Sequence, residues 1–520
     1  MPDLPADIDA LRALLLAERA RHAEEIVRLA GERDAALSES GRLQAIIRHL
    51  QRHRFGRRSE RLDPGQLALA LEDLEQALAD AEMSEEKTAP APRALPPRRR
   101  KVNRGALPTH LPRIETVIDI ADKTCPCCAG TLHRIGEDTS ERLDVVPAQF
   151  RVLVTRRPKY ACRACPGRLA QAPAPARLID GGLPSEALVA HVIVAKYADH
   201  CPLYRQAQIY ARQGITLDRS TLADWVGRAA WWLRPLHAAL RANLLASTKL
   251  FADETTAPVL DPGRGRTKTG QLWAYARDDR PWAGPAPPGV VYIYAPDRKA
   301  ERPMAHLAGF KGTLQVDGYA GYRALAAAGA VDLAFCWSHV RRRFYEIAAA
   351  GPAPIANQAL ARIAELYVVE ADIRGRDASA RRAARQDKAR PLIDSFKAWL
   401  EVQLAAVSQK AAIAGAIRYA LGRWLGLTRF LDDGRIEIDS NTVKRAIRPI
   451  ALNRKNALFA GSDGGGQHWA ILASLIETCK LNNVDPQAWL ADVFGRLVAG
   501  HPISRIDELL PWAPDALRAK

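Results

Sequence analysis

The sequence lacks a long apolar run, a basic leader and enough cysteine for a disulfide-built scaffold. No stretch of about eighteen uncharged apolar residues occurs, so no membrane-spanning helix is predicted. The N-terminal segment MPDLPADIDALRA carries acids where a secretory signal would carry Lys or Arg, and we therefore expect a cytoplasmic protein without a membrane partner. Eight cysteines in a cytosolic chain of 520 residues are not expected to form disulfides.

Acidic residues are outnumbered by basic ones. Lys and Arg total 75 against 58 for Asp and Glu, which gives a formal charge of +17. This excess favours a polyanionic partner, with nucleic acid as the leading candidate, although a basic surface kept for solubility is the alternative. The length and a hydrophobic fraction of 48% are sufficient for two to four packed domains.

Residues 1–83 are predicted to form a helical or coiled-coil arm, because apolar residues recur at three- and four-residue spacing on both sides of a basic segment. Two ordinary amphipathic helices are the alternative. Residues 84–113 are rich in Pro and Arg and are predicted to form an extended linker. The basic segment RHLQRHRFGRRSERLD suits contacts to phosphate, and its predicted DNA-binding residues are Arg52, Arg54, Arg57, Arg58 and Arg61.

Five cysteines cluster within residues 114–178, and four of them form two C-x-x-C pairs. Each pair can turn two thiolates toward one tetrahedral ion, so this segment is predicted to be a small Cys₄ zinc domain. Cys127 fits the spacing less well than its neighbour, and redox-active or free thiols are the alternative to zinc. The predicted zinc ligands are Cys125, Cys128, Cys162 and Cys165.

Residues 179–245 are predicted to be helical. The segment PLYRQAQIYARQGITLDRSTLADWV has the terminating and capping residues of a helix-turn-helix. Gly214 can end the first helix, and Ser220 can cap the second. Two packed helices without DNA contact are the alternative. Three tryptophans at helical spacing are interpreted as packing residues and not as platforms for base stacking: Trp225, Trp231 and Trp232.

The next region begins with four runs rich in β-branched and aromatic residues, LFADETTAPVL, GQLWAYARD, VVYIYAPD and GTLQVDGY, which predict strands. Asp253 lies in the first run and Asp317 in the fourth, each after apolar residues. A buried carboxylate is costly unless it is used, and carboxylates that converge from strand ends are what a pair of Mg²⁺ ions requires for phosphodiester chemistry. For either acid alone, a turn-forming role is the alternative.

Four motifs give the chain a resemblance to a known family. FADET, VDGYAGY, CWSHVRRRF and IDSNTVKRAIRPIALNRKNALFAGSDGGG, in this order, make it similar to the transposases of insertion-sequence family sixty-six over nearly its whole length. The resemblance implies an α+β multidomain DDE transposase. Its ribonuclease-H-like α/β catalytic core would span 246–470 with a helical insertion at 357–430, followed by a helical C-terminal cap at 471–520.

The resemblance also implies the catalytic residues and cofactors. Asp253 and Asp317 would be catalytic and would bind Mg²⁺ or Mn²⁺, alongside structural Zn²⁺. The third acid of similar proteins is replaced in this chain by Lys444, whose ammonium group cannot ligate Mg²⁺ and whose charge opposes a second ion. Either this copy is catalytically impaired, which is the favoured interpretation, or Glu437 in RIEIDSN takes the third position.

The expected function is binding of insertion-sequence ends, followed by metal-dependent strand cleavage and strand transfer that Lys444 limits. The alternative is a catalytically defective DNA-binding protein or repressor of the same element. The implied partners are double-stranded DNA of the terminal repeats and of the target, a second copy of the chain and helper proteins of the element. The implied location is the nucleoid of a bacterium.

Basic residues flank the two aspartates in CWSHVRRRF and RPIALNRKNALFAG. As a set they favour contacts to DNA phosphates, whereas a solvated helix face, or a core position for the histidine, is the alternative for each alone. The predicted DNA-binding residues here are His339, Arg341, Arg342, Arg343, Arg448, Arg454 and Lys455.

Overall fold

A computed structural model describes most of the chain from residue 149 onward. Contacts between residues divide the chain into two compact units, Met1–Ala89 and Pro90–Lys520. The helices and strands from residue 149 onward belong to the second unit. The linker, the predicted arginines between 52 and 61 and the four predicted zinc ligands lie outside the described residues. The described residues are 149–161, 169–261, 265–327 and 331–513, with His22, Glu25, Cys127, Gly263 and Gly329.

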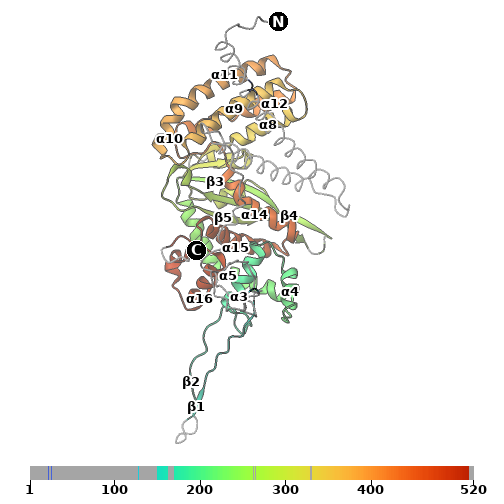
Figure 1. The fold of residues 1–520 in the computed structure, drawn as a ribbon, viewed down its shortest axis with the longest axis vertical. Helices are drawn as coiled ribbons and strands as arrows, with labels where there is room; N and C mark the ends of the chain where they lie inside the picture. The colour runs from blue at the N-terminus through green and yellow to red at the C-terminus, as the bar shows by residue number, and fades with distance from the viewer. Residues whose placement is uncertain are drawn as a thin grey trace. The chain divides into compact units, whose positions relative to one another are not determined.

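A mixed five-stranded sheet forms the centre of this unit (Figure 1), in the order β5-β4-β3-β6-β7. β3 is antiparallel to β4, which is antiparallel to β5, whereas β3, β6 and β7 run parallel. The four predicted strand runs are confirmed, and β4 is buried from Gly270 onward, as expected of an apolar central strand. The strands are β3 (Lys249–Asp261), β4 (Arg266–Arg277), β5 (Gly289–Ala295), β6 (Gly312–Val316) and β7 (Val331–Phe335).

Helices cover the open edge and one face of the sheet. On α15 (Asp463–Leu481), the Ser474 hydroxyl accepts from the backbone N–H of Tyr292 at 2.7 Å. A backbone donor on the free edge of β5 thus forms a hydrogen bond with a side chain. On α14 (Asn441–Ala457), the carbonyl of Ala446 accepts from the Tyr292 hydroxyl. α14 therefore lies over the sheet face to which the Tyr292 side chain points (Figure 1).

A block of helices is inserted between β7 and α14 and has an apolar core of its own. Trp337 and Phe396 stack within it, with ring centroids 6.1 Å apart. Figure 1 shows α8, α9, α11 and α12 gathered beyond one end of the sheet. The helices are α8 (Trp337–Ala349), α9 (Pro354–Ile373), α10 (Ala378–Ala384), the π-helical η3 (Arg385–Ala389), α11 (Arg390–Ala406), α12 (Ala412–Leu421) and α13 (Trp424–Thr428).

Two arginines are buried inside this helical block together with carboxylates. Arg385 is 0% exposed and donates to both carboxylate oxygens of Glu370. Arg381 is 1% exposed, donates to Glu370 at 3.3 Å and donates to Glu437 at 2.7 Å. The carboxylates offset the cost of burying two guanidinium groups. We call these four residues the buried charge cluster.

The segment before the sheet contains the predicted pair of helices, α4 (Leu203–Ala211) and α5 (Arg219–Leu245). Gly214 lies in the turn between them with φ +80°, as predicted. Ser220 does not cap the second helix, because α5 begins one residue earlier and Asp218 is its N-cap residue. Trp225 is buried, whereas Trp231 is 59% exposed and packs edge-to-face on Trp232, with ring centroids 5.5 Å apart.

The remaining described elements are short or terminal. No described helix combines the length and the apolar character needed to cross a membrane. These elements are β1 (Lys159–Ala161), β2 (Leu169–Gln171), α3 (Glu186–Tyr197), η1 (Arg280–Trp282), α6 (Glu301–His306), η2 (Ala320–Tyr322), α7 (Arg323–Ala327), η4 (Arg429–Leu431), α16 (Pro486–Val498) and η5 (Ile503–Leu509).

Candidate active site

Asp253 lies within β3, and Asp317 directly follows the last residue of the neighbouring parallel strand β6. Phe251 of β3 pairs with Gln315 of β6, and each aspartate lies two residues further along its strand direction. Because side chains alternate with a period of two, both carboxylates belong to the same face of the sheet, on strands that are about 5 Å apart. Two acids that are distant in the sequence are thus brought to one place.

Local hydrogen bonds orient both carboxylates. Oδ1 of Asp253 accepts from the backbone N–H of Glu254 at 2.8 Å, and Oδ1 of Asp317 accepts from the backbone N–H of Tyr319 at 2.8 Å. Gly318 follows the second aspartate with φ +102°, a conformation that favours glycine. Both aspartates are half-buried.

The start of α14 lies over the face that carries these aspartates. Across the sheet, Tyr292 pairs with Ala274, and Ala274 pairs with Asp253, so the three side chains share one face. The hydroxyl of Tyr292 reaches Ala446 of α14, as described above. Lys444, two residues earlier on the same helix, is half-buried. α14, which carries Lys444 at the predicted position of the third catalytic acid, therefore covers the face of the sheet to which Asp253 belongs.

A second acid of the motif FADET points to the opposite face. Glu254 is paired with Arg298, and one of its carboxylate oxygens accepts from the Tyr322 hydroxyl at 3.1 Å. Burial raises the pKa of Glu254, the charge of Arg298 lowers it, and the nearby Asp317 raises it further. The sequence analysis did not separate the roles of these two adjacent acids. Their side chains point to opposite faces of the sheet because side chains alternate along a strand.

Glu437 does not lie free beside the two aspartates. Its carboxylate forms the ion pair with Arg381 in the buried charge cluster, and its side chain is 13% exposed. Withdrawing this carboxylate to bind a metal ion would leave a buried guanidinium group with fewer partners, at a cost of several kcal/mol. This ion pair argues against Glu437 as a substitute for the third acid. Among the described residues, no group of three or more His, Cys, Asp or Glu side chains is placed to hold a metal ion.

Asp439, at the start of α14, is an acid that the sequence did not single out. Its carboxylate accepts from the backbone N–H and the side-chain amide of Asn441, at 3.0 and 2.9 Å. Burial raises the pKa of Asp439 to about 7, and the nearby Cys336 contributes in the same direction. These contacts identify Asp439 as a residue that shapes the entry into α14.

The predicted DNA-binding residues differ in exposure. Arg454 is 5% exposed and donates to the backbone carbonyl and the hydroxyl of Thr256 on β3, contacts that favour a structural role over the predicted contact to DNA. It instead fastens α14 to the sheet. Arg342 is half-buried and pairs with Glu346 at 3.0 Å. Of the other predicted residues, the half-buried ones are His339 and Arg341, and the exposed ones are Arg343, Arg448 and Lys455.

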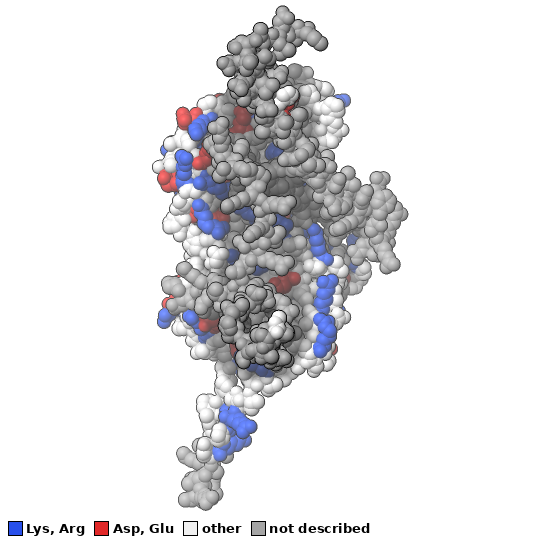
Figure 2. Space-filling model, in the orientation of Figure 1, with Lys and Arg blue, Asp and Glu red and all other residues white. Residues whose placement is uncertain are grey.

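Two further basic surfaces are visible in Figure 2. Lys and Arg side chains gather over α4 and on the described part of the β1–β2 hairpin. In the hairpin segment 149–161 they occur without any acid, which gives a concentrated positive charge. The basic residues of this segment are Arg151, Arg156, Arg157 and Lys159.

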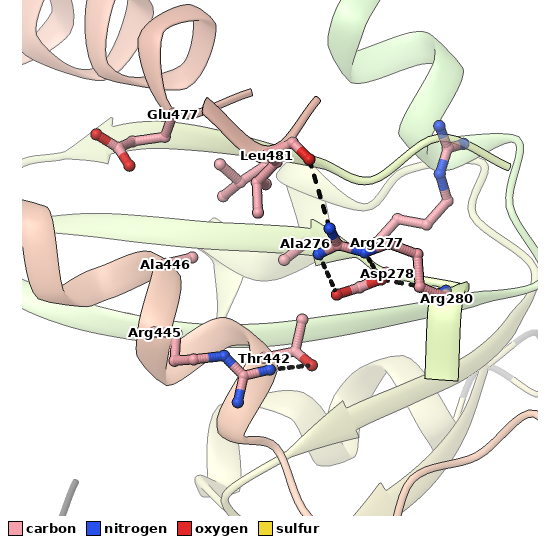
Figure 3. Close-up of a pocket in the computed structure, with 10 residues that line it drawn as sticks. Ala276, Arg277, Asp278, Arg280, Thr442, Arg445, Ala446, Glu477 and Leu481 are labelled. Atoms are coloured by element: carbon pink, nitrogen blue, oxygen red, sulfur yellow. Dashed lines mark hydrogen bonds and ion pairs between the residues drawn. The ribbon is translucent and has the colours of Figure 1, made fainter. Parts of the chain in front are cut away.

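A cavity of about 160 Å³ lies between the end of β4 and the helices α14 and α15 (Figure 3). Arg280 and Asp278 pair across it at 2.8 Å, and Arg445 and Glu477 also line it. Burial alone would raise the pKa of Asp278, but the hydrogen bond and charge of Arg280 bring it below its usual value. Neither aspartate of the candidate active site lines this cavity.

The described residues thus define a mixed α/β protein with one carboxylate inside β3, a second directly after the neighbouring strand β6, and a large helical insertion. The chain belongs to the transposase family IS66, because the sequence profile described as "Transposase IS66 family" matches residues 181–468. Three further profiles match: "IS66 C-terminal element" at 474–512, "zinc-finger binding domain of transposase IS66" at 122–166, and "Transposase C of IS166 homeodomain" at 42–116.

Relatives in *Sinorhizobium fredii* (strain NBRC 101917 / NGR234) extend over most of the chain. The uncharacterized protein y4jD is 48% identical over 483 residues, which cover 90% of this chain and 94% of the relative. The uncharacterized protein y4qI is 45% identical over 539 residues, which cover 99% of both chains. The uncharacterized protein y4hP is 38% identical over 492 residues, which cover 90% of this chain and 88% of the relative.

Proposed function

We propose that this protein is a DDE transposase that binds the ends of an insertion sequence. Its strand cleavage and strand transfer would depend on Asp253 and Asp317 and would be limited by Lys444. The observation that carries this proposal is the register of β3 and β6, which gives the two carboxylates matching positions on one face of the sheet. Membership of the IS66 transposase family and the positive charge of the chain support it.

The strand order supports a ribonuclease-H-like core. Three antiparallel strands followed by two parallel ones, with the first strand in the centre, place the end of β6 beside the first half of β3. The helical block between β7 and α14 would be the insertion of such a core. We propose the core at 246–470, the arm at 1–83, the linker at 84–113, the zinc domain at 114–178, a helical DNA-binding segment at 179–245 and the C-terminal cap at 471–520.

The donor set fits a hard divalent cation. Asp253 and Asp317 offer carboxylate oxygens, which Mg²⁺ and Mn²⁺ prefer, and both residues are half-buried. A bound cation would supply Lewis-acid polarisation of a phosphodiester. The chain's own contribution is to fix the two carboxylates through the backbone N–H groups of Glu254 and Tyr319. α14 covers the same face of the sheet and would limit the access of water.

Two substitutions test the metal site directly. Asp253→Asn and Asp317→Asn are each expected to lower Mn²⁺ affinity by at least tenfold, because each removes one of two anionic oxygen donors. Titration of the full-length protein with Mn²⁺, followed by electron paramagnetic resonance, measures this affinity. Asp332→Asn, on the exposed side of neighbouring β7, is the matched control and should bind Mn²⁺ like the unmodified protein. Unchanged affinity in both active-site variants would overturn the proposed metal site.

A catalytically defective DNA-binding protein of the same element is the second candidate. Lys444 favours it, since α14 brings an ammonium group where similar proteins have an acid, and Glu437 is committed to Arg381. Binding of the terminal repeats without cleavage, under conditions in which a Lys444→Glu variant cleaves, would select this candidate.

The zinc domain would hold one structural ion and contribute to DNA binding. The zinc-finger profile covers both C-x-x-C pairs, and Cys127, the described residue between the first two ligands, is exposed. We propose Cys125, Cys128, Cys162 and Cys165 as the ligands.

Loss of any one of these four thiolates is expected to remove the stoichiometric zinc. A variant such as Cys128→Ser should contain less than half of the zinc of the unmodified protein, as measured by mass spectrometry of the metal, because three ligands hold the ion more weakly than four. Cys127→Ser should retain all of it. Loss of zinc in Cys127→Ser with retention in Cys128→Ser would exchange the two assignments.

The proposed partners are double-stranded DNA of the terminal repeats and the target, a second copy of the chain and helper proteins of the element. The basic hairpin segment and the exposed arginines near the aspartates support the first of these.

A further inference from the structure

Two arginines stack on one tyrosine of the helical insertion. The guanidinium carbon of Arg343, on α8, lies 3.9 Å from the ring centroid of Tyr419, on α12. The guanidinium carbon of Arg423, just after α12, lies at the same distance of 3.9 Å. Two guanidinium planes cannot lie side by side on one phenol face at this distance, so they occupy opposite faces. Contacts of this length hold both cations in place.

This stack is attached to the strand end that carries Asp317. The hydroxyl of Tyr419 donates to the backbone carbonyl of Asp317 at 3.0 Å. The next residue is Gly318, where an added Cβ would lie 2.8 Å from Nε of Arg423. The absence of a side chain at this position therefore lets the guanidinium group pack directly against the backbone beside the aspartate. The insertion thus brings cationic groups to the candidate active site.

The two guanidinium groups retain hydrogen-bonding capacity. Arg343 is exposed and Arg423 is half-buried, and neither is paired with a carboxylate in the described part of the chain. Nε of Arg423 is buried against Gly318, so the terminal Nη1 and Nη2 atoms would meet a ligand, and Nη1 donates only to the carbonyl of Tyr419 over a long 3.4 Å. Guanidinium groups that are fixed in place and are not neutralised by a carboxylate are suited to bind an anionic ligand.

We propose that Arg343 and Arg423 bind phosphate oxygens of the DNA strand that reaches Asp317, and that Tyr419 positions both arginines. This inference rests on the proposed function, because it takes the DNA of the cleavage site as the ligand. The planar guanidinium fork matches phosphate geometry. The ligand is the sugar–phosphate backbone and not a base, because both faces of the Tyr419 ring are already covered. The arginines also offset the repulsion between DNA and the two aspartates.

The salt dependence of DNA binding tests this arrangement in the full-length protein. The probe is a fluorescein-labelled duplex carrying one terminal repeat, in buffer with Ca²⁺. Arg343→Gln and Arg423→Gln are each expected to reduce the slope of log Kd against log salt concentration by about 0.9, the value for one lost phosphate contact. Tyr419→Leu is expected to reduce the slope similarly although it removes no charge. Tyr419→Phe keeps the ring and should retain the slope of the unmodified protein.

Arg418→Gln is the matched control for loss of one charge on the same helix. Arg418 is exposed on α12 and donates to Gln409, away from the Tyr419 ring. Its substitution should leave the slope unchanged. Thermal denaturation establishes that each variant is folded.

Three outcomes would overturn the proposal. Unchanged slopes in both arginine variants would remove the phosphate contacts while leaving the proposed function intact, because Mn²⁺ binding at Asp317 is measured separately. An equal loss in Arg418→Gln and Arg423→Gln would reveal a general effect of charge. Failure of the unmodified protein to bind the duplex would overturn the proposed function and this inference together.

Discussion

Replacement of Lys444 by glutamate is expected to raise metal-dependent cleavage of the terminal repeats by on the order of a hundredfold or more. In the present chain, the described residues provide a pair of carboxylates without a third acid placed to join them. Lys444 lies on α14, the helix that covers the face of Asp253, and an ammonium group at the third position would oppose the binding of a second cation. Glutamate at this position would reverse that charge and supply a ligand. Cleavage of a labelled terminal repeat in Mg²⁺ or Mn²⁺ measures the effect.

Two control variants separate the new ligand from the change in charge. Lys444→Gln removes the positive charge without adding a carboxylate and should recover only a small part of the activity. Arg448→Glu reverses an exposed charge about one turn further along α14 and should not raise cleavage. If the unmodified protein cleaves at full rate and Lys444→Glu changes nothing, the assignment of this third position is wrong.

Removal of the Glu370 carboxylate is expected to produce the largest loss of stability. Arg385 is fully buried and donates two hydrogen bonds to the carboxylate of Glu370. Glu370→Gln would leave this guanidinium group buried without its counter-charge, which costs about 3–5 kcal/mol. Urea denaturation followed by circular dichroism measures the loss. Glu365→Gln, at an exposed position on the same helix, should change stability by less than about 0.5 kcal/mol.

A double variant distinguishes loss of the charge pair from a general packing defect. Glu370→Gln combined with Arg385→Met removes both charges, and part of the lost stability should return because no unpaired charge stays buried. If the double variant is less stable than Glu370→Gln alone, the charge imbalance is not the cause of the destabilisation.

The strands were predictable because each carries a local signal. β3 to β6 are runs of β-branched and aromatic residues separated by turn residues, and their register follows from burial of apolar side chains. Asp253 and Asp317 could be singled out for the same reason, since an acid that follows apolar strand residues stands out in the sequence. Their matching positions required only the parallel pairing of β3 with β6.

Other features depend on contacts that leave no local signal. Glu437 resembles a spare acid in the sequence, but its partner Arg381 lies on a different helix of the insertion. Arg454 belongs to a basic run, yet the helix turns it toward Thr256 and buries it. The stack of Arg343 on Tyr419 likewise joins two helices far apart in sequence. Composition and periodicity predict elements, whereas these side chains are placed by tertiary packing.

The buried charge cluster links the insertion to the segment that leads into α14. Arg381 belongs to α10, whereas Glu437 lies four residues before the helix that covers the candidate active site. Deleting α9 to α13 and joining α8 to the segment just before α14 that contains Glu437 would therefore leave Glu437 without its counter-ion and loosen the entry to that helix. A minimal version of the core needs a neutral residue at position 437, so the insertion and the core cannot be treated as interchangeable parts.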